Sequence, residues 1–178
     1  GVLIEDSEDM LYLYEMIDND IHQLGIAAVG SVDAYEKELI KRHEFTKPDK
    51  ELDRVKNISS LNAQTGPVLL TYLDNEELSS LLHSVANRET PIYDVKAIDG
   101  VTHRIYRVIE PHEQEKILGI MNSMDSLFIA DGHHRSAGAG VVKKKRQLEN
   151  HQHTGQESYN YFLTVSFPDS QMNILDYN

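Results

Sequence analysis

The chain has 178 residues, no cysteine, and 29 acidic against 17 basic side chains, which gives a formal net charge of −12 at pH 7. This charge argues against a protein that coats nucleic acid, because phosphate neutralisation needs clustered lysine and arginine. The lack of cysteine excludes disulfides and thiolate metal sites, and it suits a reducing, cytoplasmic compartment. No stretch has the pattern of a membrane span or a signal peptide, so we expect no membrane partner.

Short apolar runs alternate with helical stretches along the chain. This alternation predicts an α/β or α+β fold with a mixed sheet and flanking helices. The sequence opens with Gly1 rather than Met, inside what has the pattern of a structured segment, and residues 172–178 resemble a strand cut short. We therefore expect residues 1–178 to form one domain that is an internal part of a longer protein.

The first third of the chain predicts two strands and then two helices. The strands are expected at residues 11–17 and 24–32. Asp33 is expected to cap a helix that runs to about His43. A second helix is expected at residues 46–58, with a threonine as its cap and a proline in its first turn.

The middle of the chain predicts a central strand, a helix and a hairpin. The strongly apolar run "GPVLLTYL" (66–73) is the expected central strand, and Asp74 is expected to cap the helix after it. The clearest local signal is Asp99-Gly100 between the arms 91–98 and 101–109. This dipeptide suits a two-residue hairpin turn that needs positive φ.

The last third of the chain repeats the alternation and contains its most unusual stretch. We expect a helix from Pro111 to about Asp125, a strand at 126–130, a helix at about 133–148, and a closing hairpin of 159–167 and 172–177 around Pro168-Asp169.

The unusual stretch is "FIADGHHRSAGAG" (128–140), where an apolar strand meets a helix. A helix N-terminus carries free N–H groups and a partial positive charge, which together favour an anion. Gly132 removes a side chain, so that a phosphate can approach the backbone. Asp131 would serve as a magnesium ligand, a general base or the helix cap. The expected phosphate-binding residues are Gly132, His133, His134 and Arg135.

A capped helix with exposed histidines and an arginine explains the same stretch, and this alternative stays open. Two adjacent histidines on a helix point about 100° apart, which makes them a poor metal pair. We therefore expect no zinc at this turn.

A second charged cluster is "KRHEFTKPDKELDR" (41–54). His43 and Glu44 look like the start of a zincin motif, but the fourth residue after His43 is Lys47, so the zinc signature fails. In a functional interpretation Lys47 and Lys50 approach phosphates, Glu44 acts as a base or metal ligand, and His43 supports them. A solvated, charge-balanced helix is the alternative, and composition alone favours it.

Four blocks, taken in order, resemble a known family. They are "RHEFTKPDKELDR", "QTGPVLLTY", "DGVTHRIYRV" and "FIADGHHR". Together they are similar to the prokaryotic family called domain of unknown function 1015, over essentially the whole chain. The resemblance implies a longer protein, with a segment before Gly1 and a region after Asn178. It implies no biochemical role.

The turn D-G-H-H-R is in addition similar to the phosphate-binding turn of the ParB and sulfiredoxin superfamily. That superfamily includes nucleotide-hydrolysing ParB proteins, ATP-using sulfiredoxins and kinases of free serine. The resemblance implies that residues 132–135 hold nucleotide phosphates and that Asp131 lies at magnesium or the reacting hydroxyl. A sulfiredoxin reaction is excluded because it needs a cysteine. Ser136 departs from the pattern, which more often has a larger or aromatic residue there.

The leading hypothesis is a domain that binds ATP or ADP with magnesium and transfers a phosphoryl group to a small hydroxyl compound such as free serine. In the alternative, a non-catalytic module senses a nucleotide or an anionic metabolite. A DNA-binding relative of ParB conflicts with the net charge. The expected partner is a small-molecule or nucleotide ligand, and the sequence predicts no oligomeric state.

Overall fold

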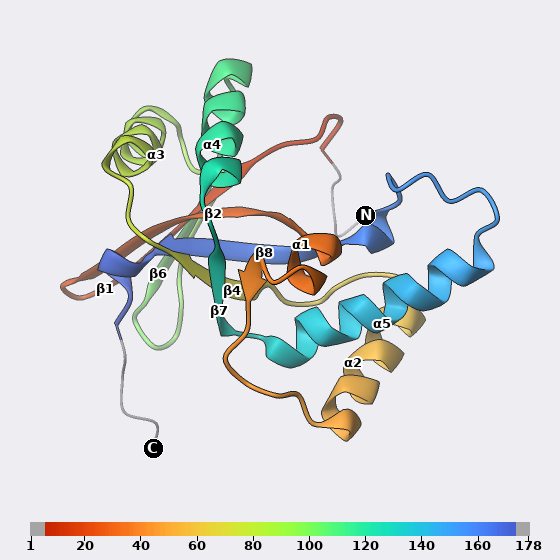
Figure 1. Ribbon diagram of the computed structural model, residues 1–178. Helices are drawn as coiled ribbons and strands as arrows, with labels where there is room; N and C mark the ends of the chain where they lie inside the picture. Colours follow the sequence, from red (N-terminus) through yellow and green to blue (C-terminus); the bar gives the residue numbers. More distant parts are fainter. Residues whose placement is uncertain (1–5, 174–178) are drawn as a thin grey trace. The chain divides into compact units, whose positions relative to one another are not determined.

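The computed structural model describes residues 6–173, and the chain divides into two compact units. The first contains residues up to 27, 74–124 and those from 167 onward, and the second contains residues 28–73 and 125–166. Helices alternate with strands that pair both parallel and antiparallel, which confirms the α/β class with a mixed sheet (Figure 1). No helix in the described residues is long and apolar enough to cross a membrane. One domain within a longer protein stays a prediction.

The first unit is built from antiparallel strands and two helices. In strand order β2 is followed by β1, β6 and β5, and each is antiparallel to its neighbour. Of β2, residues 21–27 belong to this unit. Its core includes Leu13, Leu24, Leu78 and Ile117. The bounds are β1 (Tyr12–Asp18), β2 (Ile21–Ser31), α3 (Glu76–Arg88), β5 (Tyr93–Lys96), β6 (Thr102–Arg107), α4 (Pro111–Ser123) and the short η2 (Asp169–Gln171).

The cap of α3 differs from the prediction by one residue. Asn75 is the cap, and its side chain accepts a hydrogen bond from the N–H of Leu78 at 2.9 Å. Asp74 instead accepts hydrogen bonds from the hydroxyls of Ser79 and Ser170, at 2.8 and 2.6 Å. The sequence offers two adjacent capping side chains, and because the Asp74 carboxylate is engaged by two hydroxyls, the cap is left to Asn75.

The β5–β6 hairpin forms as predicted, but its turn is longer than two residues. Gly100 has a φ of 92°, whereas Asp99 is not among the described residues with positive φ. The N–H of Val101 donates to the Asp99 carboxylate at 3.0 Å, and the N–H of Ala97 donates to the carbonyl of Val101 at 2.8 Å. The Asp99 carboxylate holds the loop through its hydrogen bond to Val101. Only Gly100, of the two residues in the predicted turn, therefore adopts the left-handed backbone.

The second unit places its strands in the order β3, β7, β4, β8. β3 is parallel to β7 and β4 is antiparallel to it, so the apolar strand β4 lies between two others, as predicted. Helix α5 packs against both α1 and α2 (Figure 1). The bounds are α1 (Val32–Glu36), β3 (Ile40–Lys41), α2 (Pro48–Leu61), β4 (Val68–Tyr72), β7 (Leu127–Asp131), α5 (His133–Glu149), η1 (Ser158–Asn160) and β8 (Tyr161–Pro168).

Helix α1 is much shorter than the predicted helix from Asp33 to about His43. Its cap is Ser31, whose Oγ accepts the N–H of Asp33 at 3.1 Å, while the Asp33 carboxylate pairs with the ammonium of Lys143. After α1 the chain takes a positive φ of 58° at Glu38 and then forms β3. The predicted length of the helix was wrong, because its apolar spacing also suits a strand. Residues at the end of the predicted helix instead form β3 and pair with the distant strand β7.

Two further predictions need correction or lie partly outside the described residues. Helix α2 begins at Pro48, but Thr46 does not cap it; its hydroxyl donates to the Glu51 carboxylate at 3.0 Å. Strand β8 confirms the first arm of the closing hairpin, and η2 follows it. Of the second arm, residues 174–177 lie outside the described residues.

Candidate functional site

The turn between β7 and α5 needs a glycine. Gly132 has φ 102° and ψ 24° and stands at the N-cap of α5. A Cβ added there would lie 3.1 Å from Nη1 of Arg135 and 3.2 Å from Cα of Val68. The glycine therefore supplies a left-handed backbone and also lets β4 approach the turn.

Arg135 is held against this turn by acceptors within the second unit. Its Nη2 donates to Oδ2 of Asp131 at 3.0 Å, and its Nη1 donates to the carbonyl of Pro67. The side chain of Arg135 is 36% exposed and that of Asp131 is 69% exposed. The guanidinium thus ties the turn to the residue that precedes β4, while both charged groups still face solvent.

His133 is buried and anchors the segment that precedes α2. It is only 5% exposed, and its Nε2 accepts the N–H of His43 at 3.5 Å. The two imidazole rings meet edge to face with 4.5 Å between centroids, and Nδ1 of His133 lies 3.9 Å from Oε2 of Glu44. Burial, assisted by His43, lowers the pKa of His133 and so favours the neutral ring that this acceptor role requires.

His134 makes a second contact of the same kind. Its Nε2 accepts the N–H of Lys47 at 3.2 Å. Both histidines therefore use a ring nitrogen to hold the backbone of residues 43–47 beside α5. Of the first N–H groups of α5, that of Arg135 already donates to the carbonyl of Gly132 at 2.8 Å. Those of His133 and His134 are the donors that a ligand at this end would meet.

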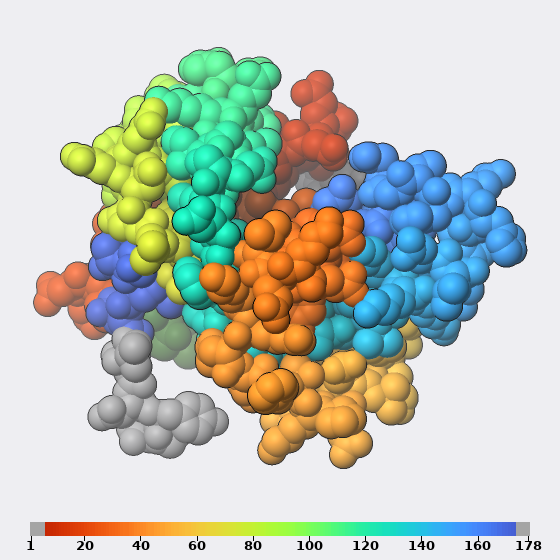
Figure 2. Space-filling model, viewed as in Figure 1, coloured from red at the N-terminus to blue at the C-terminus, as the bar shows by residue number. Residues whose placement is uncertain are grey.

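Around the turn lies an open cavity of about 500 Å³ whose lining mixes positive and negative side chains. In Figure 2 the orange segment that includes α2 lies beside the cyan start of α5. Of the predicted site residues, His43 and Lys47 are not in the lining that the structure describes, and contribute through backbone N–H groups. The lining consists of Glu44, Asp49, Lys50, Asp53, Arg54, Asp131, Gly132, His133, His134 and Arg135.

The sequence analysis included Lys50 of α2 but gave no site role to Asp49, Asp53 and Arg54, which belong to the same charged cluster and also line the cavity. The sequence did contain a signal for this contribution, namely the run of small residues in α5. Such residues allow α2 to pack closely against that helix. A Cβ on Gly138 would lie 3.0 Å from Cβ of Arg54. Ser136, which departs from the expected larger residue, is buried, and its hydroxyl donates to the carbonyl of His133 at 3.0 Å.

The carboxylates around the cavity fit a metal that arrives with phosphate better than a preformed metal centre. In the described part of the chain, no group of three or more His, Asp or Glu side chains could hold a metal ion. Magnesium usually takes one or two protein carboxylates and completes its ligands with waters and substrate phosphates. Asp131 is exposed and lines the cavity, and its Oδ2 is bonded to Arg135.

Comparison with known proteins identifies a family and no activity. The whole chain, residues 1–178, matches the family described as "Protein of unknown function (DUF1015)", which confirms the first resemblance. No curated protein and no solved structure matches the chain. The similarity of the turn to the ParB and sulfiredoxin superfamily stays a prediction.

Proposed function

The chain belongs to DUF1015, a family of proteins of unknown function, and from the site alone we propose that the cavity beside the turn binds ATP or ADP as a magnesium complex. One observation carries the proposal. Residues 131–135 meet Glu44 and Lys50 around a single cavity of about 500 Å³. Small-molecule sites typically occupy about 300 to 1,000 Å³, so a nucleotide is a suitable size of ligand.

The donors at this cavity suit phosphate oxygens. Gly132, His133 and His134 line it at the N-terminus of α5, and this positive end of a 17-residue helix favours an anion. Lys50 also lines it and has no ion pair within the described residues, so its ammonium is available to a ligand. Arg135 is already positioned by Asp131 and Pro67, which fixes its guanidinium before a ligand binds.

The charge of the lining favours a metal complex over a free anion. Carboxylates of Asp49, Asp53 and Asp131 face the same cavity as the cations and would repel bare phosphate. Magnesium, when bound, would neutralise part of the phosphate charge, and Asp131 would hold it.

In the catalytic form of the proposal, the acceptor is a small hydroxyl compound such as serine. The bond from the terminal phosphorus to its bridging oxygen breaks as the acceptor oxygen bonds to that phosphorus, and the acceptor proton passes to a carboxylate. Glu44 is the better base, because it is 56% exposed and lies 3.9 Å from His133, whereas Asp131 is paired with Arg135. The similarity of the turn to that of free serine kinases supports this choice of acceptor.

Binding is tested by calorimetric titration of the chain with ATP, ADP and pyrophosphate, with and without magnesium. We expect saturable, magnesium-dependent binding that Lys50→Ala weakens at least about tenfold. Lys56→Ala is the matched control, since Lys56 lies exposed on the same helix outside the cavity lining. Arg135→Ala should abolish binding, and circular dichroism would show whether the turn survives it. Absence of binding to all three ligands, or equal affinities of wild type and Lys50→Ala, would overturn the proposal.

Catalysis is tested separately by phosphorus NMR of the nucleotide mixed with serine and other hydroxyl compounds. A new phosphomonoester signal that disappears in Glu44→Gln is the expected result. Nucleotide that binds but is not consumed would overturn the kinase step and favour the non-catalytic nucleotide-binding module.

A further inference from the structure

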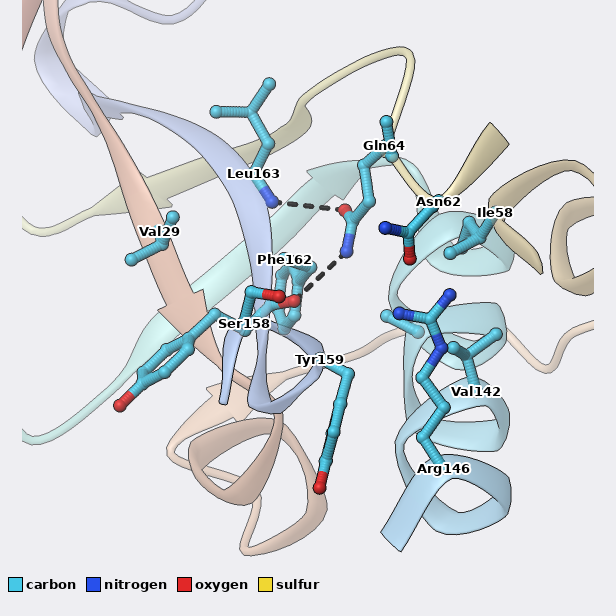
Figure 3. Close-up of a pocket in the computed structure, with 13 residues that line it drawn as sticks. Val29, Ile58, Asn62, Gln64, Val142, Arg146, Ser158, Tyr159, Phe162 and Leu163 are labelled. Atoms are coloured by element: carbon cyan, nitrogen blue, oxygen red, sulfur yellow. Dashed lines mark hydrogen bonds between the residues drawn. The ribbon is translucent and has the colours of Figure 1, made fainter. Parts of the chain in front are cut away.

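A smaller cavity of about 240 Å³ lies in the second unit, away from the turn (Figure 3). It is enclosed by the end of α2, the later turns of α5, η1 and the start of β8. None of its lining residues lines the cavity at Asp131 and Gly132, although a third cavity between them shares Ile58 and Gln64 with this one and Asp131 and Arg135 with the other.

Arg146 is the cation of this cavity. Its side chain is partly buried and has no ion pair within the described residues, and the lining contains no Asp or Glu. Two other cations of the same helix segment are paired, Lys143 with Asp33 and Lys144 with Glu36 at 2.9 Å, whereas Lys145 is exposed and has no ion pair in the described residues. What marks Arg146 is its position: it is a partly buried cation in a cavity whose described lining has no carboxylate.

The side chain of Arg146 lies along one wall of the cavity, and hydrogen bonds fix the opposite wall. Figure 3 shows its side chain running along α5 past Val142 towards Ile58 and Asn62. Gln64 fixes the opposite wall, because its Oε1 accepts the N–H of Leu163 at 3.1 Å and its Nε2 donates to a β8 carbonyl at 3.0 Å. The wall is thus closed by backbone hydrogen bonds, and the guanidinium is left as the charged group that faces the cavity.

A guanidinium that is partly removed from water without a counter-charge is destabilised, and a bound anion would offset that cost. Arginine presents a planar fork that matches a carboxylate in bidentate geometry. The apolar side chains of Ile58, Val142 and Phe162 border the same space. The cavity therefore combines one anion-binding group with apolar walls.

We propose that this cavity is a second ligand site and that it takes a small organic monocarboxylate with a short apolar body. The single cation in the described lining matches one negative charge rather than the two of a phosphate monoester. The volume, about half that of the cavity at the turn, excludes a nucleotide. The carboxylate pairs with Arg146, and the apolar body lies against Ile58 and Phe162.

The test uses isovalerate and phenylacetate as probes, followed by calorimetry and by amide NMR of the 178-residue chain. We expect saturable binding with shifts at the amides of Gln64 and Leu163, and no saturation with phenylacetamide, which lacks the charge. Arg146→Met should weaken binding at least about tenfold. Lys145→Met is the matched control, because it removes a neighbouring exposed cation outside the cavity lining.

A second variant tests the cavity without touching the arginine. Ala63 lines the cavity and is exposed, so Ala63→Phe should fill the space and abolish binding while the thermal midpoint is retained. Failure of both carboxylates to saturate, equal binding of phenylacetamide, or an unchanged affinity in Arg146→Met would overturn the proposal. Tighter binding of phenyl phosphate than of phenylacetate would overturn the choice of ligand.

Discussion

The two units of the chain use their charged clusters in opposite ways. In the first unit Glu15 is 6% exposed and accepts hydrogen bonds from Tyr106 at 2.7 Å, His22 at 2.6 Å and Arg104 at 3.4 Å. In the second unit the carboxylates at the turn are more than half exposed, and Lys50 lines an open cavity without an ion pair in the described residues.

This difference separates charges that hold a structure from charges that can meet a ligand. Burial raises the pKa of Glu15, but hydrogen bonds from Tyr106, His22 and Arg104 outweigh it, so that the pKa is lowered. Burial and the neighbouring Glu15 raise the pKa of Tyr106 to about 12. The first cluster is therefore a closed network, whereas the carboxylates of the second are exposed to solvent.

The largest effect on stability is expected from breaking the closed network. Glu15→Ala leaves the hydroxyl of Tyr106 without its carboxylate and should lower the free energy of unfolding by about 3 kcal/mol. Glu44→Ala, its counterpart in the open cluster, should change it by less than about 0.5 kcal/mol. Urea denaturation measures both, and comparable losses would remove the distinction between the clusters.

A smaller loss is expected at the backbone of the turn. Gly132→Ala places a side chain at a φ of 102° and against Val68, so it should cost about 2 kcal/mol. Gly119→Ala is the matched change in α4, where an added Cβ meets no atom within 4 Å. It should instead stabilise the protein by about 0.5 to 1 kcal/mol. If both substitutions stabilise, the turn does not need its glycine.

A pH effect should follow from His133, and it should be smaller than the loss at Gly132. Because the folded-state pKa of His133 is lowered, the stability it contributes is present above the unfolded value of about 6.5 and is lost as pH falls below it. Of the groups that face His133, the imidazoles of His43 and His134 lower its pKa, and the carboxylates of Glu44 and Asp131 raise it. Chemical denaturation between about pH 7.5 and pH 5.5 would measure the loss, which His133→Gln should reduce. If His133→Gln loses stability with falling pH as steeply as the wild type does, His133 is not the cause of that loss.

The sequence predicted the elements better than their connections. Apolar periodicity located β4, β7 and α5, and the glycine before His133 marked the turn. Two capping candidates close in the chain, Ser31 and Asp33, misled it, because both side chains can cap and the pairing of Asp33 with Lys143 leaves the cap to Ser31. The network of Glu15 with Arg104 depends on the register of β1 against β6, which links residues far apart in the chain.

For the site, sequence reasoning found residues but not all of their contacts. The turn shares a cavity with Glu44 and Lys50, and the roles assigned to these residues stay predictions. What it could not show is that His133 and His134 accept from the backbone, or that Arg135 reaches Pro67. Those contacts arise from packing of α2 against α5, which local patterns do not encode.

The smallest effect is expected on nucleotide affinity in Lys47→Ala, and this prediction rests on the proposed function. It separates a role of the Lys47 backbone from a role of its side chain. Lys47 donates its backbone N–H to His134, and its side chain is outside the described lining, so Lys47→Ala keeps that contact. Its nucleotide affinity should stay within about twofold of wild type, against about tenfold or more lost in Lys50→Ala. Calorimetry of the two variants decides the matter. Equal losses would mean that segment 43–47 closes over the ligand and brings the Lys47 ammonium to the phosphates.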